Sequence, residues 1–201
     1  MCIRDRAALV LAFHGWGQDA DELALHWRAA AACGFAVIVP RSSQQPTPGF
    51  YVWDDRETAL AEVAAQYRRA CDPVSHGAGS GGASAAPPLL LAGFSQGGGL
   101  AVDLAIDAEP APSAGFLAVS AGVEDLAEAL GPDRLAPAAA RGLRGRLLVG
   151  DCDEALDGAR LLAEAAGAAL SCALTVRPGA GHEMPEAPGE PLVAELAALL
   201  D

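Results

Sequence analysis

A serine between glycines is the part of the sequence whose residue types point most directly to chemistry. The string Gly93-Phe94-Ser95-Gln96-Gly97 fits the pattern G-x-S-x-G. The apolar residues 89–92 before it predict a strand, and residues 97–106 after it predict a helix. A serine on such a strand-to-helix turn projects outward, and the glycines relieve clashes with the neighbouring backbone. We therefore expect Ser95 to be a nucleophile; the alternative is a glycine-rich turn whose serine only caps a helix.

The candidate base for this serine is a histidine near the C-terminus. A serine hydroxyl is a weak nucleophile at neutral pH and needs a base to take its proton. His182 is the only histidine after Ser95, and it stands in Gly179-Ala180-Gly181-His182-Glu183, directly after the last predicted strand. On this kind of turn the catalytic order along the chain is serine, acid, histidine. Three histidines precede the serine and fit that order less well: His14, His26 and His76.

An acid that orients the histidine is expected after the strand predicted at residues 146–150. Asp151, Asp153 and Glu154 follow that strand. A buried carboxylate at this place would hold the imidazole tautomer and stabilise the imidazolium. Asp153 is favoured because it lies three residues beyond the strand end, far enough to turn toward the histidine loop. Asp151 stays as the alternative acid, and a solvated acidic turn without catalytic role is the remaining interpretation.

Two backbone N–H groups are expected to stabilise the oxyanion that forms when a serine attacks a carbonyl carbon. One is the N–H of Gln96, next to the nucleophile. The other comes from the loop after the first strand, His14-Gly15-Trp16-Gly17, where the N–H of Trp16 is the predicted donor. The side chain of His14 is expected to hold this loop by hydrogen bonds. Four aromatic residues fit either an apolar acyl pocket or the core: Trp16, Phe50, Tyr51 and Trp53.

Short apolar runs that alternate with helical patterns must position these residues. Such alternation predicts an α/β fold with a mostly parallel sheet, right-handed crossovers and helices on both faces. Helices are expected over residues 156–166, around an apolar face at residues 60–67, and near the C-terminus at residues 192–199. Residues 7–201 are expected to form a single domain with surface loops at residues 40–49 and 74–88. The predicted strands are 7–13, 35–39, 89–94, 115–120, 146–150 and 170–176.

Composition and charge narrow the classes of partner. The 201 residues are 52% hydrophobic and 19% charged, with a formal net charge of −13. This acidic balance argues against nucleic acid and anionic membrane surfaces, and no apolar run reaches the roughly 20 residues of a membrane span. Residues 1–6 are expected to be an extension outside the folded domain. Five widely spaced cysteines without C-x-x-C spacing favour reduced thiols, no zinc site and a cytoplasmic location: Cys2, Cys33, Cys71, Cys152 and Cys172.

Taken together, these strings resemble the α/β-hydrolase fold and, more narrowly, the phospholipase/carboxylesterase family, which includes acyl-protein thioesterases. The resemblance covers nearly the whole chain from Ala7 on, whereas the region between Ser120 and Arg146 is atypical. It rests on five strings: His14-Gly15-Trp16-Gly17, Trp53-Asp54, Gly93-Phe94-Ser95-Gln96-Gly97-Gly98, Gly150-x-x-Asp153 and Gly181-His182-Glu183.

The resemblance implies a fold without a large cap domain and a triad of Ser95, Asp153 and His182. It also implies oxyanion donors at Trp16 and Gln96, and neither a metal nor an organic cofactor. The expected activity is hydrolysis of a small-molecule carboxylic ester or thioester through an acyl-enzyme on Ser95. A lactone- or peptide-type hydrolase on the same fold, and a catalytically silent binding module, are the alternatives. The pattern leaves the acyl group, the leaving group and the oligomeric state open.

Overall fold

The computed structural model describes residues 8–71, 87–167 and 169–201. The extension predicted at residues 1–6 lies outside these ranges. So does the loop predicted at residues 74–88, except for Pro87 and Pro88.

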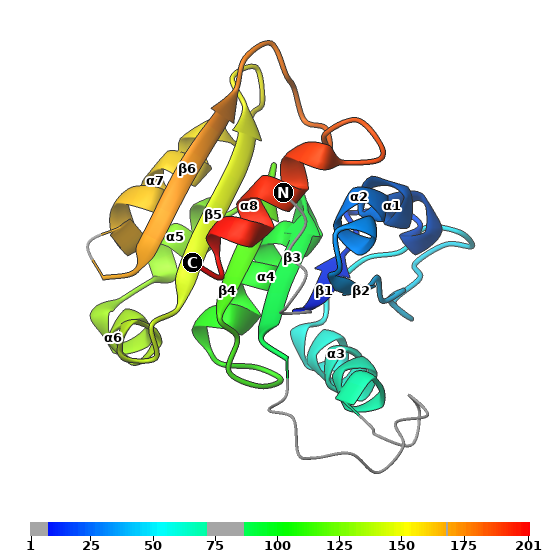
Figure 1. Ribbon diagram of the computed structural model, residues 1–201, viewed down its shortest axis with the longest axis horizontal. Helices are drawn as coiled ribbons and strands as arrows, with labels where there is room; N and C mark the ends of the chain where they lie inside the picture. Colours follow the sequence, from blue (N-terminus) through cyan, green and yellow to red (C-terminus); the bar gives the residue numbers. More distant parts are fainter. Residues whose placement is uncertain (1–7, 72–86, 168) are drawn as a thin grey trace.

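Six strands form one sheet in the order β2-β1-β3-β4-β5-β6, and every neighbouring pair is parallel (Figure 1). The chain runs from β1 outward to β2 and then returns to β3 on the other side of β1. The strand order therefore reverses between β1 and β3, so a crevice is expected there at the carboxyl ends of the strands. The strands are β1 (Leu9–Phe13), β2 (Ala36–Ile38), β3 (Leu89–Phe94), β4 (Gly115–Val119), β5 (Arg144–Gly150) and β6 (Ser171–Arg177).

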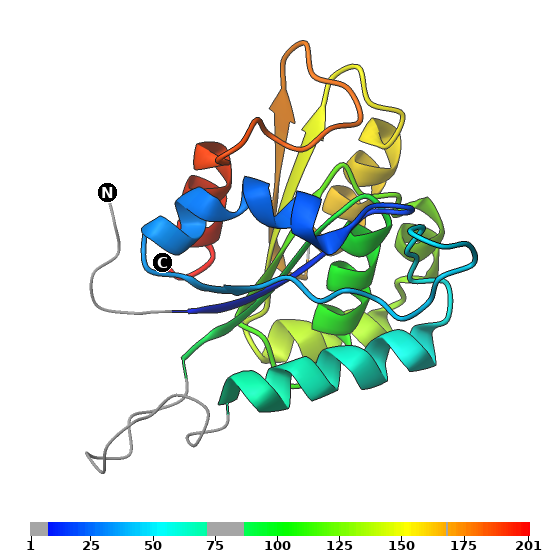
Figure 2. The same ribbon diagram turned by 90° about the vertical axis from the view of Figure 1, so that its right-hand side faces the viewer.

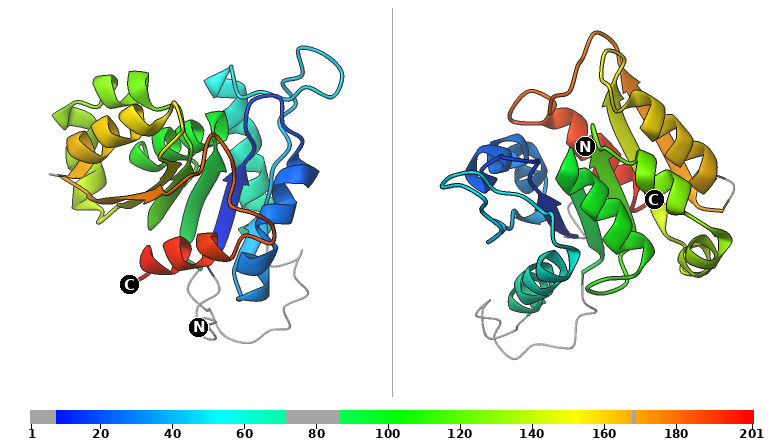
Figure 3. Two further views of the ribbon diagram at one scale, coloured as in Figure 1. Left: turned by 90° about the horizontal axis from the view of Figure 1, so that it is seen from above. Right: turned by 180° about the vertical axis from the view of Figure 1, so that it is seen from behind.

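Helices cover both faces of the sheet, as the sequence predicts (Figures 2 and 3). Alternate side chains of the strands point to opposite faces, so each face has its own apolar core. One face packs against α3 (Arg56–Cys71), α4 (Gln96–Ile106), α5 (Glu124–Ala129), α6 (Pro132–Ala140) and α7 (Leu156–Gly167). The opposite face packs against α1 (Ala20–His26), α2 (Arg28–Ala32) and α8 (Glu190–Ala198).

The predicted strands agree with the observed ones, except for small shifts at their ends. Strands β1, β3 and β4 are almost wholly buried on both faces, which confirms the expected helical cover. For β2 and β6 that expectation is wrong, because edge strands have one neighbour and remain partly exposed. The prediction did not assign helices to α1, α2, α5 and α6, which have only five to nine residues each.

The segment between β4 and β5 contains only α5 and α6, and no large cap domain interrupts the described ranges. Arg56 of α3 and Arg134 of α6 both pair with Asp103 on α4, at 2.5 and 2.7 Å. Both arginines also contact Asp107. These ion pairs tie the three helices together near the C-terminal end of α4. Over residues 8–71, 87–167 and 169–201, no helix has the length and apolarity needed to cross a membrane.

Candidate active site

Ser95 occupies the tight turn between β3 and α4. Its φ of +52° and ψ of −122° lie in a region that L-residues rarely adopt, and its N–H donates to the carbonyl of Val119 on β4 at 2.9 Å. The helix α4 starts at the next residue, so its free N–H groups and partial positive charge lie beside the hydroxyl. A Cβ atom at Gly97 would lie 2.4 Å from the carbonyl oxygens of Phe13 and His14. Glycine at this position therefore lets α4 approach the end of β1.

The structure brings Ser95, His182 and Asp153 into one chain of contacts. Nε2 of His182 lies 2.9 Å from Oγ of Ser95, and Nδ1 lies 2.9 Å from Oδ1 of Asp153. The Asp153 side chain is fully buried, whereas 38% of the His182 side chain is exposed. With the Nδ1–H tautomer, the imidazole donates to the carboxylate and presents Nε2 to the hydroxyl. This arrangement can take a proton from the serine and hold the resulting imidazolium.

Backbone contacts fix the acid loop against the histidine loop. The N–H of Cys152 donates to the carbonyl of Ala180 at 3.0 Å, and a Cβ at Gly150 would lie 2.1 Å from the same oxygen. Asp151, the alternative acid, accepts from the N–H of Gly179 at 2.7 Å. The Asp151 carboxylate therefore binds the backbone of the histidine loop, whereas Asp153 contacts the imidazole of His182.

The Asp153 carboxylate is held in its charged form by donors. Burial alone would raise its pKa, but Ser120, the N–H of Ala155 and His182 together keep that pKa below the ordinary value. The N–H of Ala155 donates to Oδ1 at 2.9 Å. As the side chains stand, Oδ2 of Asp153 and Oγ of Ser120 are both buried without a hydrogen-bond partner. Because a hydroxyl hydrogen rotates and buried polar groups are almost always paired, we take Ser120 as the donor to Oδ2.

Removing this hydroxyl should make folding less dependent on the charge of Asp153. A carboxyl with a lowered pKa stabilises the fold above its unfolded value, near 3.9, and this stability is lost as pH falls through the folded pKa. Ser120→Ala is therefore expected to cost about 1–3 kcal/mol of unfolding free energy at pH 6 and progressively less below pH 4.

Urea titrations between pH 6 and pH 3 measure this difference. Ser113→Ala is the matched control, because the Ser113 hydroxyl is also buried without a partner. Its cost should stay constant with pH. A cost of Ser120→Ala that is equally constant would remove Ser120 as a donor to the carboxylate.

The loop after β1 brings backbone donors to the same place. Within the described ranges, neither the N–H of Trp16 nor that of Gln96 donates to another group of the chain. Both residues line a pocket of about 570 Å³ together with Ser95 and His182. The two N–H groups predicted as oxyanion donors are thus left without partners at the wall of this pocket. Its remaining lining residues are Gly122, Glu124, Glu154 and Ala155.

The side chain of His14 supports this loop from inside. It is fully buried, its Nδ1 donates to the carbonyl of Gly15 at 2.9 Å, and its Nε2 accepts from the N–H of Ser42 at 3.3 Å. Burial lowers its pKa, which keeps the imidazole neutral as these bonds require. The ring of Trp53 stacks on it at 4.7 Å. These contacts agree with the expected supporting role of His14.

The aromatic residues divide between core and surface. Trp53 is buried, and its indole N–H donates to the carbonyl of His14 at 3.0 Å. Trp16 is 64% exposed and meets Phe50 edge-to-face at 4.5 Å. The guanidinium of Arg41 lies 5.4 Å from the ring centre of Tyr51.

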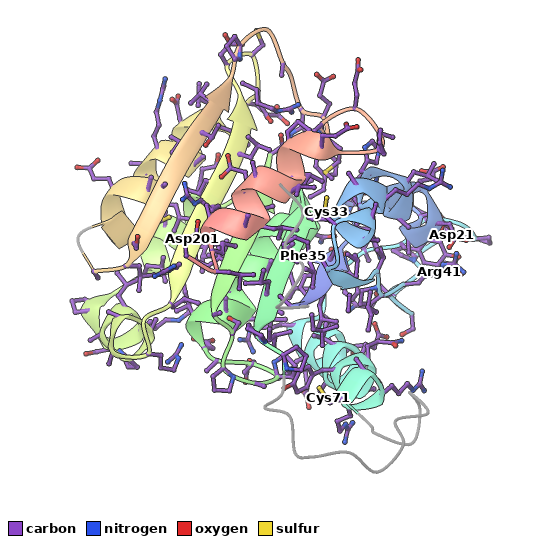
Figure 4. The ribbon with its side chains drawn as sticks, viewed as in Figure 1. Asp21, Cys33, Phe35, Arg41, Cys71 and Asp201 are labelled. Atoms are coloured by element: carbon purple, nitrogen blue, oxygen red, sulfur yellow. The ribbon has the colours of Figure 1, made fainter. Side chains whose placement is uncertain are left out.

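Ion pairs of Arg41 hold the loop between β2 and α3, which carries Phe50, Tyr51 and Trp53. Arg41 pairs with Asp21 of α1 at 2.9 Å, and the two side chains lie together in Figure 4. Arg41 also pairs with Asp19, the N-cap of α1, at 3.0 Å. The segment that follows β2 is thereby tied to the segment that follows β1.

Comparison with solved structures establishes the fold. An uncharacterized protein from Bacillus cereus ATCC 10987 superposes with a TM-score of 0.77 at 19% identity; the match covers 99% of this chain but only 62% of that protein. Esterase PE8 gives 0.66 at 18% identity, covering 96% and 93%. Acyl-protein thioesterase 2 of Zea mays gives 0.58 at 17% identity, covering 98% and 95%. The chain has the α/β-hydrolase fold. No protein-family model and no curated protein sequence matches it.

In this fold the candidate site lies where the strand order reverses. Trp16 follows β1 and Ser95 follows β3, the two strands on either side of the switch point. The sequence predicted the residues that meet here, but it missed Ser120 and the pocket residues Gly122, Glu124 and Ala155. Ser120 ends a predicted strand, and its φ of +47° is visible only in the structure. Nothing in the sequence pattern marks it as facing a carboxylate.

Proposed function

We propose that this α/β-hydrolase cleaves carboxylic esters or thioesters through an acyl-enzyme on Ser95. The observation that carries the proposal is the pair of 2.9 Å contacts that joins Asp153 to His182 and His182 to Ser95 at an open pocket. A serine, an imidazole and a buried carboxylate in this order are the groups that acyl transfer needs.

The proposed reaction has two halves. Nε2 of His182 takes the proton of Ser95, and Oγ attacks the acyl carbon to give a tetrahedral intermediate. The imidazolium then protonates the leaving oxygen or sulfur, the bond to the leaving group breaks, and the acyl group stays on Oγ. Water attacks this ester with the same imidazole as base, releases the carboxylic acid and restores Ser95. Each step uses only groups of the chain, the substrate and water.

Two backbone donors complete the proposed site. The N–H groups of Trp16 and Gln96 would bind the oxyanion of each tetrahedral intermediate, and each such donor typically contributes about 3 kcal/mol to the transition state. Asp153 would keep the imidazole tautomer fixed and offset the charge of the imidazolium.

The proposed relatives are the phospholipase/carboxylesterase family, whose motifs the sequence resembles. An esterase and an acyl-protein thioesterase among the similar structures agree with this choice of reaction. A small-molecule ester or thioester in the cytoplasm is the substrate we propose, bound without metal or organic cofactor.

Fluorophosphonate labelling of the intact protein tests the proposal. The probe phosphonylates a serine only where a base activates the hydroxyl, so the wild type should be labelled once, on the peptide that contains Ser95. Ser95→Ala should lose the label, whereas Ser171→Ala, which removes an exposed serine at the start of β6, should keep it. An unlabelled wild type, or equal labelling of Ser95→Ala, would show that Ser95 is not the nucleophile. A catalytically silent binding module would give the first of these results.

A further inference from the structure

A groove continues from the pocket at Ser95 along the surface of α4. It has a volume of about 470 Å³ and shares Gln96 and Gly122 with the pocket, so the two spaces adjoin. Its floor is formed by Gln96, Gly99, Leu100 and Asp103. These residues are spaced i, i+3, i+4 and i+7, which places them on one stripe of the helix. Seven helical residues span about 10 Å, so the floor leads about that far from the nucleophile.

The walls of this groove are mainly apolar, with the exposed carboxylate Asp125 of α5 as the exception. Trp53 lines one side, while Leu126 and Ala129 of α5 line the other. A Cβ at Gly99 would lie 3.1 Å from the carbonyl oxygen of Gly122, the residue that both spaces share. A side chain at Gly97 or Gly98 would clash with the residues that α4 packs against. Gly99, by contrast, is only partly buried and faces the groove. Its missing side chain keeps the passage between pocket and groove open.

The far end of the groove is polar. There Asp103 forms ion pairs with Arg56 and Arg134, at 2.5 and 2.7 Å, and all three residues line the groove. An apolar chain that reached this end would have to desolvate an ion network, which costs free energy. The groove therefore suits an apolar segment of limited length.

The position of His182 indicates whether the apolar segment in the groove is the acyl chain or the leaving group of the ester. The leaving group must lie beside Nε2 of His182, because it receives the proton held there. His182 lines the pocket together with Glu154 and Ala155, and it does not line the groove. The groove begins instead at Gln96, whose N–H is the proposed oxyanion donor. The leaving group would thus depart past His182, while the acyl carbon faces the entrance of the groove.

We propose that the groove between α4 and α5 binds the acyl chain of the substrate, and that the protein prefers medium-chain acyl esters. This inference rests on the proposed function, because it needs Ser95 as the attacked position. Each methylene that leaves water should raise kcat/KM by about two- to fourfold, fourfold being the value for complete burial. The gain ends where the chain meets the ion pairs of Asp103.

The test compares p-nitrophenyl esters from acetate to decanoate in the wild type and two variants. Wild-type kcat/KM should rise from acetate to hexanoate or octanoate and then level off or fall. Ala129→Trp changes an exposed position of α5 and fills the groove, so it should lower the octanoate-to-acetate ratio about tenfold or more. Leu126→Ala removes part of the wall and should lower the same ratio about threefold.

Leu161→Trp is the matched control. It places the same bulky ring on α7, in a separate hollow lined by Ala127, Glu128 and Glu164, and should leave both the ratio and the acetate activity unchanged. Acetate esters of longer alcohols should show no dependence on Ala129→Trp.

Three outcomes would overturn the inference. The wild type could show no rise with acyl length, Ala129→Trp could leave the ratio unchanged, or it could act on alcohol length instead, which would assign the groove to the leaving group. In each case Ser95-dependent acetate hydrolysis would remain, and the proposed function would stand. Absence of that hydrolysis in the wild type would overturn both proposals.

Discussion

Asp153→Asn is expected to lower kcat for p-nitrophenyl esters about 10⁴-fold, with little change in KM. The carboxylate accepts from Nδ1 of His182 at 2.9 Å in a fully buried position. An asparagine amide could present its NH₂ group to Nδ1, which would place the imidazole proton on Nε2. The histidine would then face Ser95 as a donor and could not take the serine proton. The measurement is steady-state hydrolysis at pH 7.5, with circular dichroism to confirm that the variant is folded.

Asp151→Asn is the matched control for this variant, two residues away in the same loop. Asp151 accepts from the N–H of Gly179 through Oδ1. An asparagine keeps a carbonyl oxygen at that position, so kcat should remain within about threefold of the wild type. A large loss in Asp151→Asn together with a small loss in Asp153→Asn would exchange the roles of the two carboxylates.

Gly97→Ala is expected to lower the free energy of unfolding by about 3 kcal/mol, the upper end of the usual cost of overpacking. The added Cβ would lie 2.4 Å from two carbonyl oxygens, those of Phe13 and His14. Backbone atoms cannot rotate away as a side chain can, so α4 would have to move off β1. That movement would also displace Ser95, and we expect esterase activity to fall together with stability. Urea unfolding followed by circular dichroism measures the loss.

Gly167→Ala is the control for this helical glycine. A Cβ at Gly167, the last residue of α7, would meet no atom within 4 Å. Since alanine favours helix more than glycine does, stability should stay equal or rise by up to about 1 kcal/mol. If Gly97→Ala unfolded at the same urea concentration as the wild type, the close approach of α4 to β1 would not be needed.

The sequence predicted the parts of the molecule that local patterns determine. Residues 89–94 and 97–106 are an uninterrupted apolar run and a helical segment, so the turn that carries Ser95 could be located from neighbours alone. The cores of all six strands could be placed in the same way, because buried parallel strands are short and apolar. Which strands lie at the exposed edges of the sheet could not be predicted, because the order of strands across a sheet depends on the whole chain. That order leaves β2 and β6 at the edges.

Only the tertiary structure decided which side chains meet. The sequence placed Asp151 and Asp153 in one loop, but their separate contacts with Gly179 and His182 depend on how the loops after β5 and β6 pack together. Ser120 faces Asp153 because β4 lies between β3 and β5, a long-range relation that no local pattern carries. The groove along α4 likewise needs α5 beside it. Residue type and spacing identify the reactive groups, whereas the distances between these groups follow from packing between distant segments.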